Sequence, residues 1–459
     1  MPKRAMKALI IALGLLILPP PYAHAIEFSA PCDTPHVFSG AAVNVVVLPY
    51  TQPLSFSERL TKSGEQLAAL VQLESALAIA KYGSVGLVQL IGDPRQGCTP
   101  DEVLPKLLGQ KDGAMEPVRQ GNGLVLIWGR IYESGPDLFV QSFIRFLRRG
   151  ENEMIDIPVG SRSLRGQLTS QAFACTPRRI AVRDLEDIQK QYASARLLHA
   201  QPDAASPAVK IPDEAGSPLS FAITDVRGDW VQLEPMVRTP GRRDTFPRGW
   251  LQARAPAARW SLRRQLPELL FVEAAAGYLA ARVPRDMSAE QRNAALTSAI
   301  DALSEYLERW RENAVLDSDP SAPTGTPFAL AVPRQLGGFI RLLKDGASDT
   351  SLDAAQAEFQ RAAIQAPHSP EARALAALSG FAVAYRRARP DQSPRPFLDD
   401  LRITLGADPD NKILIANLVA AYDLMLTLPP GAPSSWNIPP AERQELTRQR
   451  DAMKRLAGS

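Results

Sequence analysis

The sequence is poor in the residues that most often carry enzyme chemistry. Its 459 residues include three cysteines and four histidines. His36, His199 and His368 fall in predicted loops or turns, and no cysteine or acid stands beside them at metal-ligand spacing. The composition therefore predicts no metal site.

Motifs that bind nucleotides or activate nucleophiles are missing as well. The chain has no glycine-rich phosphate loop, no HExxH or CxxC motif and no GxSxG serine elbow. The acid pairs near residues 317–319 and 408–411 lack the glycine and terminal glutamate of a calcium loop, so solvated turns are predicted there. No cofactor is predicted. A hydrolase with dispersed acidic residues stays open as the alternative function, because paired carboxylates leave no sequence motif.

Long apolar runs are absent except at the N-terminus. There, three basic residues precede an apolar stretch of about 11 residues, which is too short to span a bilayer. Ala23 and Ala25 then supply the small residues of a cleavage site. Residues 1–25 are therefore predicted to be a cleaved signal peptide, with a retained anchor helix as the alternative. The mature chain is expected to begin at Ile26, to be periplasmic and to have no transmembrane segment.

The mature chain has no excess of either charge. The formal net charge of +3 falls to zero because residues 1–25 hold three basic and no acidic residues. This balance gives no reason to expect nucleic acid as a partner.

One stretch departs from this balance, since residues 238–264 hold eight arginines and one acid. Arg238, Arg242, Arg243 and Arg248 are predicted contacts to cell wall or another anionic surface, because guanidinium groups pair with carboxylates and phosphates. Alternatively, the arginines are solvated or pair with acids of neighbouring domains.

All three cysteines lie before residue 176, at Cys32, Cys98 and Cys175. In an oxidising compartment one pair can form a disulfide, which would fasten only the N-terminal domain. The sequence does not choose among the three pairings.

Short apolar runs alternate with helical patterns in the first third of the chain. Strands are predicted at residues 43–49, 84–91, 124–132, 138–147 and 154–159, and a helix at residues 57–80. This order predicts a small α/β domain over residues 26–180. The runs VNVVVLPY and LVLIWGRIY resemble those of the N-terminal domain of TolB-like periplasmic proteins. An unrelated α/β sandwich is the alternative.

Residues 194–255 change to short strands and turns. Trp230 follows Gly228-Asp229, and Trp250 follows Gly249, a rhythm that resembles the last strands of a bacterial SH3-like barrel. Large rings suit the core of a small barrel, so both tryptophans are predicted core residues, with ligand stacking as the alternative. An insertion at residues 235–248 lengthens the hairpin and puts any inherited ligand groove in doubt.

The C-terminal third is predicted to be helical. In AQAEFQRAAIQAP, residues Ala355, Phe359, Ala362 and Pro367 are spaced as in the second helix of a tetratricopeptide (TPR) repeat, which they resemble. Small residues admit the partner helix, the ring fills the gap, and proline ends the helix. Leu401 and Pro409 repeat this register 42 residues later, which is longer than a standard repeat. A generic array of helical hairpins is therefore the alternative.

Together these patterns predict a multidomain α+β protein. A helical segment at residues 260–316 follows the SH3-like region, TPR-like hairpins span residues 333–428, and residues 429–459 form a tail with a short helix. The resemblance to TPR proteins implies an interaction scaffold. The predicted function is thus an exported, non-catalytic binding or scaffold protein of the bacterial envelope that engages protein partners through its helices.

Overall fold

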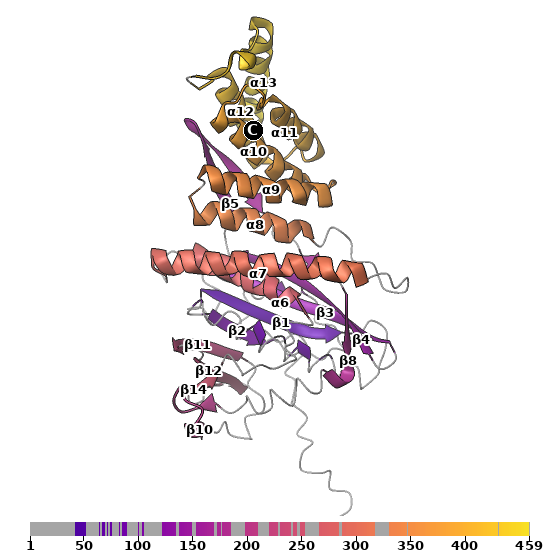
Figure 1. Cartoon of the computed structure of the whole chain (residues 1–459), viewed down its shortest axis with the longest axis vertical. Coiled ribbons are helices and arrows are strands. Elements are labelled where there is room, and N and C mark those ends of the chain that lie inside the picture. The colour runs from indigo at the N-terminus through magenta and orange to yellow at the C-terminus, as the bar shows by residue number, and fades with distance from the viewer. Residues whose placement is uncertain are drawn as a thin grey trace, which may run out of the picture.

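Short valine-rich runs and long amphipathic runs divide the chain into a sheet half and a helical half (Figure 1). The computed structural model describes single positions between 64 and 104 and the ranges 42–51, 85–89, 122–134, 137–148, 153–168, 172–175, 177–184, 198–209, 220–227, 230–239, 242–245, 248–252, 266–283, 287–316, 330–346, 348–429 and 431–458. The chain is mixed α+β, as predicted, with the sheet in its N-terminal half. The predicted signal peptide lies outside the described residues.

The sheet is built around β1 (Val43–Thr51), whose described side chains are buried because strands flank it on both edges. β2 (Val85–Gln89) and β3 (Gly123–Ser134) pair with it in parallel, and β4 (Asp137–Arg148) pairs antiparallel with β3. Two short strands, β7 (Phe173–Ala174) and β8 (Arg178–Ala181), pair with β4.

Strands from residues 198–252 extend this same sheet. They are β9 (Leu198–His199), β10 (Ala208–Val209), β11 (Ser220–Arg227), β12 (Trp230–Thr239), β13 (Arg242–Thr245) and β14 (Gly249–Gln252). β11 pairs antiparallel with β2, with Ser220 opposite Val88. The predicted boundary between 26–180 and 194–255 therefore does not separate two sheets. An open edge on β2 would leave its backbone groups unpaired, and β11 satisfies them.

A nearly wholly buried helix covers the sheet. α6 (Glu268–Arg282) packs on β1, β3 and β4, and α7 (Ala289–Leu316) packs over α6. α6 carries apolar residues on every side, since the sheet packs against one side of it and α7 against the other. The helical half begins with this pair.

The remaining helices stack outward from α7 (Figure 1). They are α8 (Ala331–Lys344), α9 (Asp349–Gln365), α10 (Pro370–Arg387), α11 (Arg395–Ala407), α12 (Lys412–Leu426) and α13 (Pro440–Gly458), with the short 3-10 helix η5 (Ser434–Trp436) before α13. Ser348, Ser369 and Asn411 cap α9, α10 and α12 through their side-chain oxygens. The predicted tail helix, α13, packs on α12.

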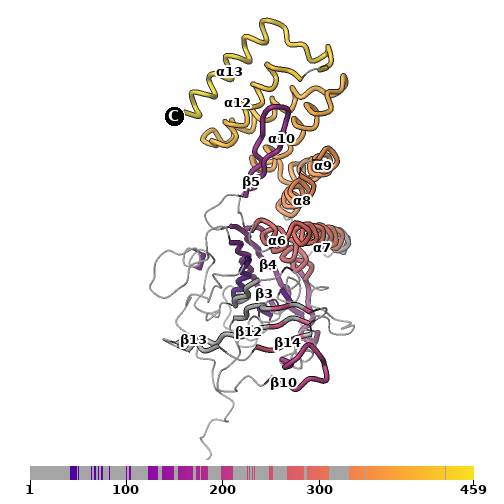
Figure 2. Tube along the Cα trace, turned by 90° about the vertical axis from the view of Figure 1, so that its left-hand side faces the viewer, coloured from indigo at the N-terminus to yellow at the C-terminus, as the bar shows by residue number. Residues whose placement is uncertain are grey.

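One strand pair leaves the sheet and enters the helical half. β5 (Glu153–Val159) and β6 (Arg162–Leu168) form a separate two-stranded sheet that packs on α8, α10 and α12 (Figures 1 and 2). Residues 154–159 were predicted to be a further strand of the α/β domain. The strand is confirmed as β5, and it lies in a separate two-stranded sheet with β6 because the buried face of this hairpin packs on α8, α10 and α12.

No helix in the described part of the chain is both long and apolar enough to cross a bilayer.

Replacing Phe359 by alanine tests the packing of the helical half. Phe359 is fully buried, and its ring meets Phe339 of α8 edge-on at 6.0 Å between centroids. Phe359→Ala is expected to lower the free energy of unfolding by about 3–5 kcal/mol, the usual cost of emptying such a site. Urea unfolding monitored by circular dichroism measures the change.

The matched control is Ile364→Ala on the same helix, where the side chain is 78% exposed. It is expected to change stability by less than about 0.5 kcal/mol. An effect below about 1 kcal/mol for Phe359→Ala would contradict the packing described here.

Candidate functional site

The β5–β6 hairpin shows the alternation of a strand pair with one buried face. Ile157, Val159 and Leu164 are fully buried, whereas Asp156, Pro158 and Ser163 are exposed. Gly160 and Ser161 form the two-residue turn, and Gly160 has a φ of +56°. A two-residue hairpin turn needs this left-handed conformation, which glycine adopts without strain.

The hairpin rests on one surface of the helical half, formed by α8, α10 and α12. We call this the hairpin-binding surface. Its contact residues are Phe339, Leu375, Tyr385, Asn417, Asp423 and Leu424.

The fit is closest at Gly166. A Cβ atom there would stand 3.0 Å from Leu375 Cδ2 and 3.2 Å from Ile155 Cγ2. Such contacts are tighter than normal van der Waals packing, so the strand approaches α10 closely because residue 166 has no side chain.

Asn417 holds the backbone of β6 with both ends of its amide. Its Oδ1 accepts from the Arg165 backbone N–H at 2.7 Å, and its Nδ2 donates to the Arg165 carbonyl at 2.8 Å. Asn417 is itself buried on α12. Its amide pairs with backbone groups at the free edge of β6, as a neighbouring strand would. Because only backbone atoms of Arg165 are bound, this contact does not depend on the side chain at that position.

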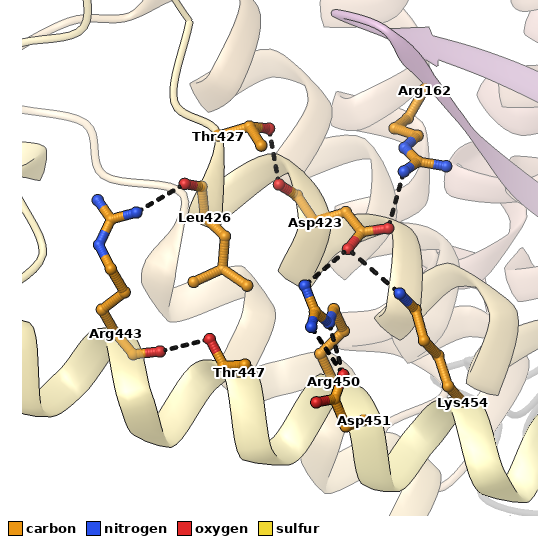
Figure 3. Close-up of polar contacts among 9 residues, drawn as sticks. All are labelled: Arg162, Asp423, Leu426, Thr427, Arg443, Thr447, Arg450, Asp451 and Lys454. Carbon is orange, nitrogen blue, oxygen red and sulfur yellow. Dashed lines mark hydrogen bonds and ion pairs between the residues drawn. The ribbon is translucent and has the colours of Figure 1, made fainter.

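A charged junction fixes the tip of the hairpin (Figure 3). Arg162 at the start of β6 places Nη2 2.9 Å from Asp423 Oδ2 on α12. The other oxygen of Asp423 faces Arg450 and Lys454 of α13, at 3.5 and 3.8 Å. Asp423 therefore connects the hairpin, α12 and α13. Since Arg162 is half-exposed, solvent screens this ion pair and its own contribution to stability is small.

The root of the hairpin is held by a buried charge network. Glu153 at the start of β5 accepts from Arg148 Nε at 2.7 Å and from the Tyr278 hydroxyl at 2.5 Å. Arg282 of α6 donates to the Met154 carbonyl at 3.1 Å. Burial and the Glu153 carboxylate raise the pKa of Tyr278, which keeps its hydroxyl a hydrogen-bond donor. The root thus joins the end of the sheet to the first helix of the helical half.

A hollow opens beside β6 on the same surface. Its walls include Gln167 of β6, Leu375 of α10, Thr404 of α11 and Asn417 of α12. The hollow is flanked by the acid Glu371 and by Asn411, so it offers polar as well as apolar groups next to the bound strand.

The predicted anion contacts lie in the sheet half, far along the chain from this surface. The β12–β13 register sets Arg238 opposite Arg243 and Thr239 opposite Arg242. Arg248 is exposed just before β14. The register thus places three of the four predicted positions on one strand pair.

Of the two tryptophans, Trp250 is buried and Trp230 half-buried. The Arg227 guanidinium lies over the Trp250 ring at 4.9 Å from its centroid, and Trp230 meets the His199 ring edge-on at 5.4 Å. Both rings are engaged by side chains of this chain.

The TPR-like residues lie in the second helix of a packed pair. Ala355 and Ala362 are fully buried in α9, and Pro367 is exposed in the turn that follows. Cys175 is a buried free thiol, whereas Cys32 and Cys98 lie outside the described residues. Within the described part of the chain, no group of three or more histidine, cysteine or acidic side chains is placed to hold a metal ion.

A second polar cluster lies between the sheet and α6. Ser142 Oγ donates to Glu268 Oε1 at 2.6 Å, and Tyr50 lies 3.0 Å from the same hydroxyl. Burial raises the pKa of Glu268, and Arg178 partly offsets this. Burial also raises the pKa of Cys175. The serine and the acid are covered by the protein, so no substrate reaches them in this arrangement.

Sequence reasoning missed the residues that build the hairpin-binding surface. The signal for the hairpin was present, since Gly160-Ser161 separates two alternating runs. Asn417 and Asp423 left no signal, because a single amide or acid on a helix is usually a surface residue.

Removing the Asn417 amide tests its hold on β6. Asn417→Ala leaves the Arg165 N–H and carbonyl without their partner, so we expect unfolding to become easier by about 1–3 kcal/mol. Hydrogen exchange at the Arg165 amide should accelerate. Exposed Asn437 supplies the control variant Asn437→Ala, with no change in either measurement. Unaltered protection of Arg165 in Asn417→Ala would show that the amide does not hold the strand.

Replacing Glu268 by glutamine tests the buried cluster through pH. A raised pKa means that the folded state keeps the Glu268 proton after the unfolded chain has lost it above its usual value near 4.5. The stability from Glu268 is thus full below that pH and falls as pH rises through the folded pKa. Glu268→Gln should remove this decline. Urea unfolding between pH 5 and 8 compares it with wild type and with exposed Glu290→Gln. Parallel curves for wild type and Glu268→Gln would refute the assignment.

Comparison with known proteins adds no template for this surface. No family model matches the chain, and no curated protein or solved structure matches it.

Proposed function

We propose that this is an exported, non-catalytic binding or scaffold protein of the bacterial cell envelope, which engages protein segments through its helical half. One observation carries the proposal: the helices already hold an extended segment by its backbone, with Asn417 clamping both polar groups of Arg165. A surface that binds main-chain groups and buries alternate side chains has the chemistry of strand recognition. The predicted signal peptide supports export to the periplasm.

We propose further that residues 333–428 are TPR-like. Phe359 and Leu401 are both fully buried, and Pro367 and Pro409 both stand in the turns that end α9 and α11. This spacing supports a repeated helical unit, which suits a protein that presents an extended binding surface.

The strands of residues 194–255 are proposed to act as an SH3-like module. Buried Trp250 and the antiparallel run from β11 to β14 support this assignment. Arg238, Arg242, Arg243 and Arg248 are proposed to contact cell wall or another anionic surface, supported by the eight arginines and one acid of residues 238–264.

The proposal includes that the protein is not an enzyme. Support comes from the burial of Ser142 and Glu268, the serine–carboxylate pair of the cluster beneath α6. A reacting pair must touch its substrate, and this pair is covered.

Photo-crosslinking in the native periplasm tests the proposal. A photoreactive amino acid at Gln167, on the wall of the hollow, is expected to capture discrete protein partners. The matched control places it at Ile364, which is 78% exposed on α9, a helix outside the hairpin-binding surface. Equal labelling at both positions, or no protein adduct at Gln167, would count against a scaffold acting through this surface. Mass spectrometry of the same preparation shows whether the exported chain begins at Ile26.

A further inference from the structure

We infer that the hairpin-binding surface recognises a partner β-strand of the pattern basic–x–apolar–x–glycine–x–apolar. In this structure the β5–β6 hairpin occupies the surface that the partner strand would bind. The inference rests on the proposed binding function and specifies its partner. The basis of the inference is β6, which has the sequence RSLRGQL from residue 162 to 168. Four of its seven positions are constrained by charge, burial or close packing.

The basic position is set by charge. Arg162 pairs with Asp423, whose side chain is only 13% exposed and whose carboxylate cannot move far because Arg450 and Lys454 hold its other oxygen. A partner strand with arginine or lysine at this position would meet the same fixed carboxylate.

The two apolar positions are set by burial. Leu164 and Leu168 are buried, at 0% and 2% exposure, and both belong to the hydrophobic core of the molecule. A polar side chain at either position would lose its hydration without a hydrogen-bond partner among apolar neighbours such as Leu375 and Leu378.

The glycine position is the most selective. At residue 166 a Cβ atom would already be 3.0 Å from Leu375 Cδ2 and 3.2 Å from Ile155 Cγ2, so a side chain there requires these neighbours to shift. A branched residue here is expected to hold the strand farther from the helices than glycine does, which would weaken the two bonds from Asn417 to its backbone.

The remaining positions are free. Ser163 and Arg165 are exposed, and Asn417 binds only the backbone at residue 165. The surface therefore specifies four side-chain positions and one backbone register, and it leaves the alternate positions open.

The hairpin can leave this surface without breaking the large sheet. Among the described residues, β5 and β6 pair only with each other. The root network at Glu153 lies at the opposite end from Arg162 and Gly160, so the root stays attached while the tip and β6 withdraw. A strand that offers the same contacts competes with the hairpin at the disadvantage set by the tether, which gives the hairpin a high effective concentration.

A peptide made from the hairpin itself serves as the test probe. It is a cyclised, fluorescein-labelled peptide of residues 153–168, and a second version carries Gly166→Val. Binding is measured by fluorescence anisotropy against the full chain as wild type, Gly166→Val, and Gly166→Val/Asn417→Ala. In the Gly166→Val chain the tethered hairpin no longer fits, while the helices keep their own residues.

The expected result is a reciprocal pattern. The Gly166→Val chain binds the unmodified probe at least about tenfold more tightly than wild type does, since the tethered hairpin reduces the fraction of open surface. The probe with Gly166→Val binds at least about tenfold more weakly to the same chain. Adding Asn417→Ala weakens binding of the unmodified probe.

The matched control is Ser163→Val, which adds a branched side chain at an exposed position of the same strand and should behave as wild type. Thermal melts establish that each variant folds. If Gly166→Val does not fold, Leu164→Ser opens the surface by a second route, because its side chain is fully buried in the closed state.

Three outcomes would overturn the inference. A folded Gly166→Val chain that does not bind the probe shows that the surface does not accept a free strand, and equal binding by wild type places the probe elsewhere. A wild-type dimer with exchanged hairpins, seen by light scattering, assigns the surface to a second copy of the chain. Protein adducts at Gln167 despite a failed probe experiment would leave the binding function standing and remove only this partner.

Discussion

The packing of one β-hairpin on three helices is the contact on which this structure depends. Asn417 and Arg165 are 252 positions apart, and Arg162 and Asp423 are 261 apart, yet each pair is in direct contact. The hairpin buries one complete face, so its apolar side chains add burial that neither the sheet nor the helices would have alone. This contact holds the far end of the helical stack to a segment of the sheet half (Figure 2).

Charges within the molecule act at the two ends of the hairpin in different ways. At the root, Glu153 is buried, and its carboxylate faces Arg148 and Arg282 and accepts a hydrogen bond from the Tyr278 hydroxyl. At the tip, Asp423 and Arg162 meet near solvent, where an ion pair directs geometry more than it adds stability. The root is therefore held by buried charges and the tip by a half-exposed ion pair.

Apart from β5 and β6, the described strands of the sheet half form one sheet and not two separate ones. Strands from residues 198–252 complete an edge that β2 would otherwise expose, and α6 then covers β1, β3 and β4. The arginines of β12 and β13 lie in this half, and the hairpin-binding surface lies in the other.

The sequence by itself determined the local elements. α10 at residues 370–387 follows from its own residues, because Ser369 caps its first turn, Pro370 begins it and apolar residues keep helical spacing. β1 and the β3–β4 pair followed in the same way from valine-rich runs and a Gly-Pro turn. Only the tertiary structure decided that β11 joins β2, that β5 and β6 leave the sheet, and that Asn417 and Asp423 face the hairpin. Each of these depends on contacts between segments far apart in the chain, and the alternation of a strand records that one face is buried without recording what buries it.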